Sequence, residues 1–214
     1  MPKDTFFNLS EDKREKIMRA AISEFSKNGF EKGNVGNIAK SAGVAKGSMY
    51  QYFENKKELF LYSVQWSMEL LVKKYNKYIT MTNKDVNIFD YFYQNSKDIW
   101  VQLRDEREVV IFIQDVFLGK YSRFTDESMA CMMKFSDEYI LKLIQDGKSN
   151  GSIRKDIDDK LLSLFLTGVS FKFKEYLMKK ARIAGEDIVD EDFEMMEKEI
   201  KAMIELLKNG MGAK

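Results

Sequence analysis

The sequence predicts an all-α protein with two lobes, on three observations. The single proline, Pro2, stands near the start of the chain, so every interior position keeps its backbone N–H donor for helix hydrogen bonds. Apolar residues recur at helical spacing, as Ile17, Ala21 and Phe25 do. Hydrophobic residues make up 44% and charged residues 32% of the 214 residues, enough to build a core and to solvate long helix faces.

The first helix is predicted from Glu11 to about Asn28. Ser10 can cap the free amides at its start, where the acids Glu11 and Asp12 favour the positive end of the helix dipole. Asn28 and Gly29 suit the left-handed conformation in which many helices end. The pattern therefore places a long helix before the most informative part of the chain.

Two short amphipathic helices around a glycine turn are predicted in the run VGNIAKSAGVAKGSMYQYF, residues 35–53. Asn34 caps the first, which reaches about Ser41, and Gly43 supplies a turn that tolerates positive φ. The second spans about residues 46–52. Ile38, Ala39, Met49 and Phe53 are the inward positions of this pair. The arrangement is typical of a helix-turn-helix DNA reader.

The outward face of the second short helix is the candidate DNA-reading surface. No carboxylate occurs between Gly33 and Phe53, and residues 1–57 carry 11 Lys and Arg against 7 Asp and Glu although the whole chain has a net charge of only +1. A basic head can release counterions from phosphates. The alternatives are two packed helices without a DNA role and, for the tyrosines, packing against the first helix. The candidates are Lys46, Gly47, Ser48, Tyr50, Gln51 and Tyr52.

The remaining helices are predicted from capping signals and apolar periodicity. Asn55 and Glu58 resemble a capping box at the start of a helix that continues to about Tyr78. Val109–Ile113 has strand-like composition but no alternating pattern, which favours a buried helix. The later helices are expected at about residues 86–104, 106–118, 125–148, 158–182 and 190–208.

Composition argues against an enzyme. The chain has no histidine and one cysteine, Cys131, which removes the commonest acid-base, nucleophilic and zinc constellations and any internal disulfide. The densest acidic cluster is Asp156, Asp158 and Asp159, which is expected to cap a helix. We therefore expect no metal, no cofactor and no catalytic residue. Cys131 is expected to be a small core residue, with redox sensing as the alternative.

We expect the protein to be cytoplasmic and not attached to a membrane. No apolar run approaches the roughly 18 residues of a membrane span. The first ten residues, MPKDTFFNLS, lack the apolar region of a secretory signal.

The chain resembles the TetR family of bacterial transcriptional repressors. The resemblance is close over about residues 13–62, including FSKNGFEKGNVGNIAKSAGVAKGSMYQYFENKKELF, and GKSNGSIRKDID at residues 147–158 is similar to the usual start of that family's last helix pair. It implies about nine helices: an N-terminal three-helix helix-turn-helix DNA-binding domain at residues 1–55, and a C-terminal helical ligand-binding and dimerisation domain at residues 56–214. It also implies a homodimer on a palindromic double-stranded DNA operator, released by a small inducer.

The resemblance carries DNA contacts onto individual positions. Lys46 and Ser48 match residues that reach the major groove, Tyr50 and Tyr52 match contacts to backbone or bases, and Lys56 matches a phosphate contact. Asn34 stands where the family often has a threonine that caps the helix near phosphate.

Two departures from the family limit this transfer. Gly36 lacks the long side chain with which some relatives read a base, and Tyr52 stands where histidine is frequent. We therefore expect the first short helix to anchor phosphate more than to read sequence.

The resemblance also gives roles to apolar residues of the body, each of which is by itself more typical of a core. The expected inducer is largely apolar or aromatic, and its candidate contacts are Trp66, Phe92, Trp100, Phe112, Phe117, Phe135 and Phe171. The last two helices are expected to form a four-helix interface with their dimer mates. Its candidate residues are Leu162, Phe165, Val169, Met196, Ile200, Met203 and Leu207.

Two functional alternatives stay open at this point. The helix-turn-helix of a helical interaction module binds protein instead of DNA; steeply salt-dependent, sequence-selective association with duplex DNA distinguishes the repressor from it. Activation instead of repression is also compatible with the same DNA-reading surface.

Overall fold

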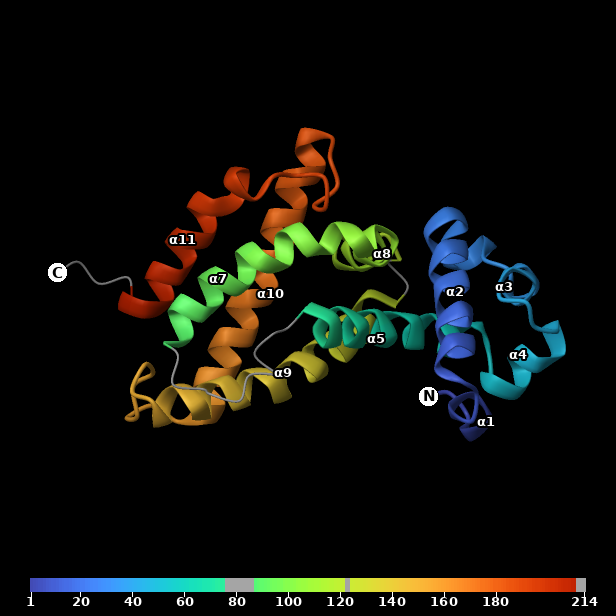
Figure 1. The fold of residues 1–214 in the computed structure, drawn as a ribbon, viewed down its shortest axis with the longest axis horizontal. Coiled ribbons are helices and arrows are strands. Elements are labelled where there is room, and N and C mark those ends of the chain that lie inside the picture. Colours follow the sequence, from blue (N-terminus) through green and yellow to red (C-terminus); the bar gives the residue numbers. More distant parts are fainter. Residues whose placement is uncertain (76–86, 122–123, 211–214) are drawn as a thin grey trace. The chain divides into compact units, whose positions relative to one another are not determined.

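The computed structural model describes residues 1–75, 87–121 and 124–210, without the side chains of residues 125, 135 and 138 (Figure 1). Helices dominate these residues and no β-strand occurs among them, so the predicted all-α class is confirmed. Within the same ranges, no helix is both long enough and apolar enough to cross a membrane.

The amino-terminal helices are α1 (Asp4–Phe7), α2 (Glu11–Lys32), α3 (Val35–Ser41), α4 (Lys46–Tyr52) and α5 (Lys56–Tyr75). The helix α1 was not predicted. The start of α2 is as expected, but the Ser10 side chain makes no capping hydrogen bond. Gly29 interrupts α2 with φ +69°, and one further turn carries the helix to Lys32. The predicted last residues of α5, 76–78, lie outside the described residues.

The capping signal before α5 works in part as predicted. The Glu58 backbone N–H donates to Asn55 Oδ1 at 2.9 Å, which is the expected N-cap bond. The Glu58 carboxylate reaches the backbone N–H of Glu54 at 3.1 Å instead of that of Asn55.

The later helices match the predicted ranges to within a few residues. They are α7 (Ile88–Gln102), α8 (Arg107–Phe117), α9 (Thr125–Ser149), α10 (Asp159–Ala184) and α11 (Phe193–Asn209). A 3-10 turn, η1 (Leu103–Glu106), follows α7. Four residues of the Val109–Ile113 run are buried in α8, which confirms a buried helix there.

The structure divides into two compact units. The first unit comprises residues 1–70 and 107–132, so α8 packs with helices that precede it by more than 40 residues. Its core includes a cluster of aromatic rings around Phe60, whose centroid lies 5.3 Å from Phe25, 5.8 Å from Phe112 and 5.0 Å from Tyr121. The functional boundary at residue 55 stays a prediction.

The second unit comprises residues 71–106 and 133–214. Ile88 and Tyr91 of α7 pack with Ile144 of α9 in its core. Gly147 permits this approach, because a Cβ there would lie 2.9 Å from Ile88 and 2.8 Å from Ile153. At the other end of α7, the Trp100 ring packs 6.0 Å from Phe193 of α11.

Candidate functional site

The turn between α3 and α4 has the predicted geometry. Asn34 Oδ1 accepts the backbone N–H of Gly36 at 2.7 Å and so caps α3. Gly43 has φ +68°, a conformation that favours glycine, and the next residue, Val44, donates its N–H to Ala39 O at 2.9 Å. The predicted cap and turn are confirmed.

The inner faces of the two short helices are buried as expected. Ile38 and Met49 are 0% and 1% exposed, and Phe53 is 2% exposed. α3 packs against α2, whose Ile17 and Phe25 are also fully buried. Because Met49 faces the core, the opposite side of α4 forms its outer face.

The outer face of α4 presents polar groups. Lys46, Gly47 and Gln51 are exposed, Tyr50 is 48% exposed, and Ser48 is half-buried. A Cβ added at Gly36 would lie 3.6 Å from Cδ of Lys46, so the lysine stem runs beside the first turn of α3. A Cβ at Gly36 would make only ordinary van der Waals contact with Lys46, and its tightest contact would be with the capping Asn34 Oδ1 at 3.0 Å.

Tyr52 was expected on an outward or grazing face of α4, but the structure places it on the inner side; its DNA contact stays a prediction. It is 7% exposed, and its ring centroid lies 6.1 Å from that of Phe6 in α1. The reason is the unpredicted helix α1, which brings an aromatic ring to the end of α4. The packing alternative therefore describes the Tyr52 ring, with α1 and not α2 as its partner.

Lys56 closes the end of α2. Its Nζ donates to Glu31 O at 3.0 Å and to Gly33 O at 3.1 Å, and lies 4.7 Å from the centroid of the Phe30 ring. Carbonyls at a helix C-terminus favour such a cation. Two of the three ammonium donors are thus used within the protein, and the phosphate contact of Lys56 stays a prediction.

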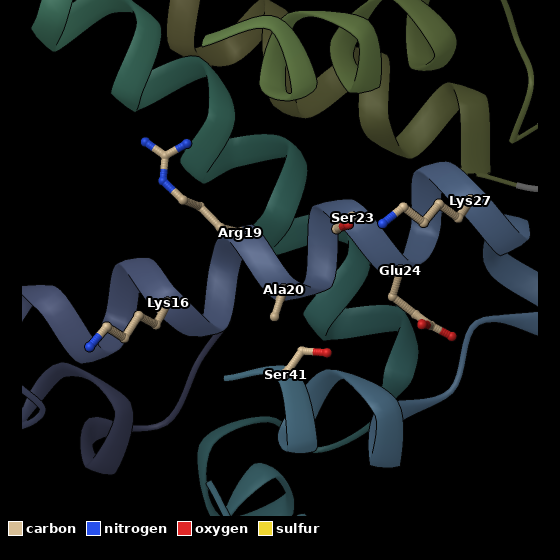
Figure 2. Close-up of a pocket in the computed structure, with 7 residues that line it drawn as sticks. All are labelled: Lys16, Arg19, Ala20, Ser23, Glu24, Lys27 and Ser41. Atoms are coloured by element: carbon tan, nitrogen blue, oxygen red, sulfur yellow. The ribbon is translucent and has the colours of Figure 1, made fainter. Parts of the chain in front are cut away.

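An open hollow of about 340 Å³ lies where α2 and α3 meet. Figure 2 shows five side chains of α2 and Ser41 of α3 around it, together with Lys16 nearer the start of α2. Glu24 on its wall accepts the backbone N–H of Asn34 at 2.9 Å, which ties α2 to the start of α3. The hollow contains none of the predicted ligand-binding aromatics. The lining residues are Lys16, Arg19, Ala20, Ser23, Glu24, Lys27 and Ser41.

The predicted ligand-binding aromatics divide between the two units. Trp66, Phe112 and Phe117 belong to the first unit, and Phe92, Trp100 and Phe171 to the second. Phe112, Phe117 and Phe171 are buried. Trp100 Nε1 donates to Glu191 O at 2.8 Å, which fixes its ring. The side chain of Phe135 lies outside the described part. A shared pocket stays a prediction.

The outer face of α10 carries an apolar row. Phe165, one of the predicted interface residues, is 54% exposed, whereas Leu162 packs against the core of the second unit and Val169 is half-buried. Sequence reasoning missed several members of this row, because their prediction requires knowledge of which side of α10 packs inward. The exposed members are Leu161, Leu164, Phe165, Tyr176 and Ile183.

On α11 the predicted interface residues differ in burial, and their role in a dimer stays a prediction. Met196 and Ile200 are 1% and 4% exposed, so they belong to the core of the protomer. The reason is that α11 packs its Phe193 side on α7, which places Met196 and Ile200 in the protomer core. Met203 and Leu207 are half-buried. Met195 and Leu206, at 62% and 46% exposed, are the large apolar residues that this helix presents outward.

The acidic cluster before α10 has structural partners. Asp158 Oδ1 caps the helix by accepting the N–H groups of Lys160 and Leu161 at 2.9 and 3.2 Å. Asp156 pairs with Arg154, which lowers the pKa of its carboxyl to about 2. The capping role of Asp158 is confirmed. Among the described residues, no group of three or more side chains could hold a metal ion.

Comparisons with known proteins agree with this geometry. Residues 17–62 match the family model for bacterial regulatory proteins of the tetR family. IcaR of Staphylococcus aureus, the negative transcriptional regulator of the icaADBC biofilm operon, is 28% identical over 147 residues, which are 64% of this chain and 76% of IcaR.

Solved structures share the fold along nearly the whole chain. A TetR family transcriptional regulator from Chloroflexus aurantiacus is 25% identical with a TM-score of 0.54, and the match covers 100% of both chains. FadR from Bacillus subtilis, solved in complex with stearoyl-CoA, is 18% identical with a TM-score of 0.62, covering 92% of this chain and 99% of FadR.

Proposed function

Because this chain is a transcriptional regulator of the TetR family and not an enzyme, we propose that it represses transcription as a homodimer on a palindromic DNA operator, and that a small apolar ligand releases it. IcaR, a negative regulator, supports repression over activation. A cytoplasmic location follows from access to DNA.

The observation that carries the proposal is the outer face of α4. Lys46 and Gln51 are exposed there, Tyr50 is half-exposed, and no acid lies between Gly33 and Phe53. Lysine donates to guanine acceptors, glutamine pairs with adenine, and tyrosine combines hydroxyl bonding with apolar contact. Such a surface suits the major groove, with Ser48 and the backbone at Gly47 close to the DNA.

Dimerisation is supported by the apolar row on α10. Leu164 and Phe165 are more than half exposed in the protomer, and burying such side chains favours association. Two DNA-reading heads must then meet successive major grooves at about 34–36 Å, so a change in their spacing lowers affinity.

Ligand response requires a path to the DNA-binding helices, and α8 supplies one within the first unit. Beyond its C-terminal end, Lys120 Nζ donates to Ser26 O at 3.3 Å and Tyr121 Oη donates to Phe25 O at 3.2 Å. Phe112 of α8 packs against Phe60 of α5, with ring centroids 5.8 Å apart. A ligand that displaces α8 thereby tilts α2 and α5. Linkage requires DNA to weaken ligand binding by the same factor.

Fatty acyl-CoA is the first ligand class to test. FadR, which shares this fold, binds stearoyl-CoA, and a long acyl chain fits the expectation of a largely apolar inducer. The test adds stearoyl-CoA or a short-chain acyl-CoA to the preformed complex with DNA and measures release. Release by the long chain alone supports the proposal, whereas retention with both chains excludes this ligand class.

The decisive experiment for the DNA function is selection from randomised duplex DNA by the purified full-length protein, followed by sequencing. An enriched inverted repeat supports a symmetric DNA-reading dimer. Absence of any enriched sequence at low salt would favour the helical interaction module instead.

A further inference from the structure

The C-terminal end of α4 is held by the first residues of the chain. A helix leaves its last four carbonyls without intrahelical partners. In α4 the Met49 carbonyl accepts the N–H of Phe53 at 2.9 Å. The other three carbonyls, of Tyr50, Gln51 and Tyr52, accept hydrogen bonds from Lys3 and Thr5.

These bonds use both side chains and backbone. Lys3 Nζ donates to Tyr50 O at 3.0 Å, and the Lys3 backbone N–H donates to Tyr52 O at 2.9 Å. Thr5 Oγ1 donates to Gln51 O at 2.5 Å. The Lys3 ammonium also stands at the negative end of the α4 dipole, where a cation is favourable.

Apolar packing fixes the same segment. Phe6 is fully buried, and its ring centroid lies 5.0 Å from that of Phe53 and 5.5 Å from that of Tyr62 in α5. Phe6 therefore keeps Lys3 and Thr5 in register with the end of α4, and Figure 1 shows α1 at that end of the helix.

The length of α4 makes this support necessary. The helix has seven residues, and helices shorter than about 12 residues are marginal in water without tertiary contacts. The candidate groove contacts run along its outer face, from Lys46 in the first turn to Tyr50 and Gln51 in the last, so bonds to the backbone carbonyls restrain the helix without occupying that face.

We propose that Lys3 and Thr5 are positioning residues for DNA recognition: they clamp the C-terminal carbonyls of α4 and hold its outer face in the orientation that reads bases. This inference rests on the proposed DNA-binding function. It assigns no base or phosphate contact to either residue.

The test uses two variants of the full chain that remove one donor each. Thr5→Val keeps the shape and the charge, and Lys3→Met keeps the aliphatic stem. Thr5→Ser and Lys3→Arg, which retain the donors, are the matched controls. Affinities are measured for the selected operator and for random duplex DNA over a range of salt concentrations, and amide hydrogen exchange is followed in residues 46–53.

Each removed hydrogen bond should lower operator affinity about three- to tenfold and leave random-DNA affinity unchanged. Amide exchange in α4 should accelerate while exchange in α2 stays the same. The control variants should keep the wild-type operator affinity and the wild-type exchange rates.

Unchanged operator affinity and unchanged exchange in both Thr5→Val and Lys3→Met would overturn the inference. An equal loss on operator and random DNA in Lys3→Met, with a shallower salt dependence, would also overturn it, because Lys3 would then contact phosphate. Failure of the wild type to select an operator would refute the proposed function, and the exchange data would still decide whether the clamp exists.

Discussion

The outer faces of α4 and α10 are both left uncovered within their own unit, but they differ in chemistry. α4 presents Lys46, Tyr50 and Gln51, whereas α10 presents Leu164 and Phe165. Hydrogen-bonding side chains can exchange water for base edges, and apolar side chains gain by leaving water altogether. The two proposed partners match this difference: nucleic acid is proposed for the polar face of α4, and a second copy of the chain for the apolar face of α10.

The largest expected effect on binding to a partner tests the α10 half of this comparison. Phe165→Asp places a charge in the proposed interface and should raise the dimer dissociation constant by about thirtyfold or more, since interface hot spots contribute about 2 kcal/mol. Sedimentation velocity at micromolar concentration measures it. Phe165→Leu, which keeps the site apolar, should remain dimeric. A variant that sediments like the wild type would remove α10 from the interface.

The next prediction separates the two sides of α11. Met196→Ala should lower the free energy of unfolding by about 2–5 kcal/mol, because the side chain is 1% exposed in the protomer. Denaturant unfolding at several protein concentrations measures it. Met195→Ala, at an exposed position, should instead weaken association. The opposite result for the two methionines would reverse the assignment of this helix's faces.

A smaller effect sharpens the α4 half. Lys46→Ala should cost about 1–3 kcal/mol of discrimination between operator and random DNA, since the ammonium is expected to donate to guanine. Competition binding at fixed salt measures it. Lys40→Ala, which removes an exposed charge from α3, serves as the control and should weaken both DNAs alike. Equal losses for Lys46→Ala would mean that Lys46 contacts phosphate only.

The smallest effects compare a glycine on each helix. An added Cβ at Gly47 of α4 or at Gly168 of α10 would meet no atom within 4 Å. Alanine at either position should therefore stabilise the protomer by about 0.5–1 kcal/mol, measured by thermal unfolding. Gly47→Ala should weaken DNA binding alone, and Gly168→Ala should weaken dimerisation alone. If both variants gained stability and kept wild-type DNA binding and dimerisation, neither glycine would be needed for close approach of the helix backbone to DNA or to the second protomer.

The sequence predicted the elements better than it predicted which face of each later helix is uncovered. The Asn34 cap, the Gly43 turn and the inward set Ile38 and Met49 depend on neighbours in sequence, so local chemistry determined them. Met196 and Ile200 depend on how α11 packs against α7, and helical periodicity alone gives two adjacent apolar stripes without saying which one meets the protomer.

The buried position of Tyr52 shows the same limit at the other end of the chain. Its burial depends on Phe6 in a helix of four residues, too short for periodicity to predict. A signal was present in Asp4, since an acid in the first turn favours a helix start, but it becomes informative only with the ring that follows. The clamp on α4 was therefore outside the reach of sequence reasoning.

The ring cluster around Phe60 bears on how such a protein can be divided by recombination. Phe112, Tyr121 and Phe124 join Phe60 although they follow the end of α4 by about 60 to 70 positions. A fragment that ended at residue 70 would return these apolar contacts to water, at about 25 cal/mol per Å². If the DNA-reading helices were exchanged between relatives, α8 would have to be exchanged with them. The segment that can be transferred as a folded unit is therefore not continuous in sequence.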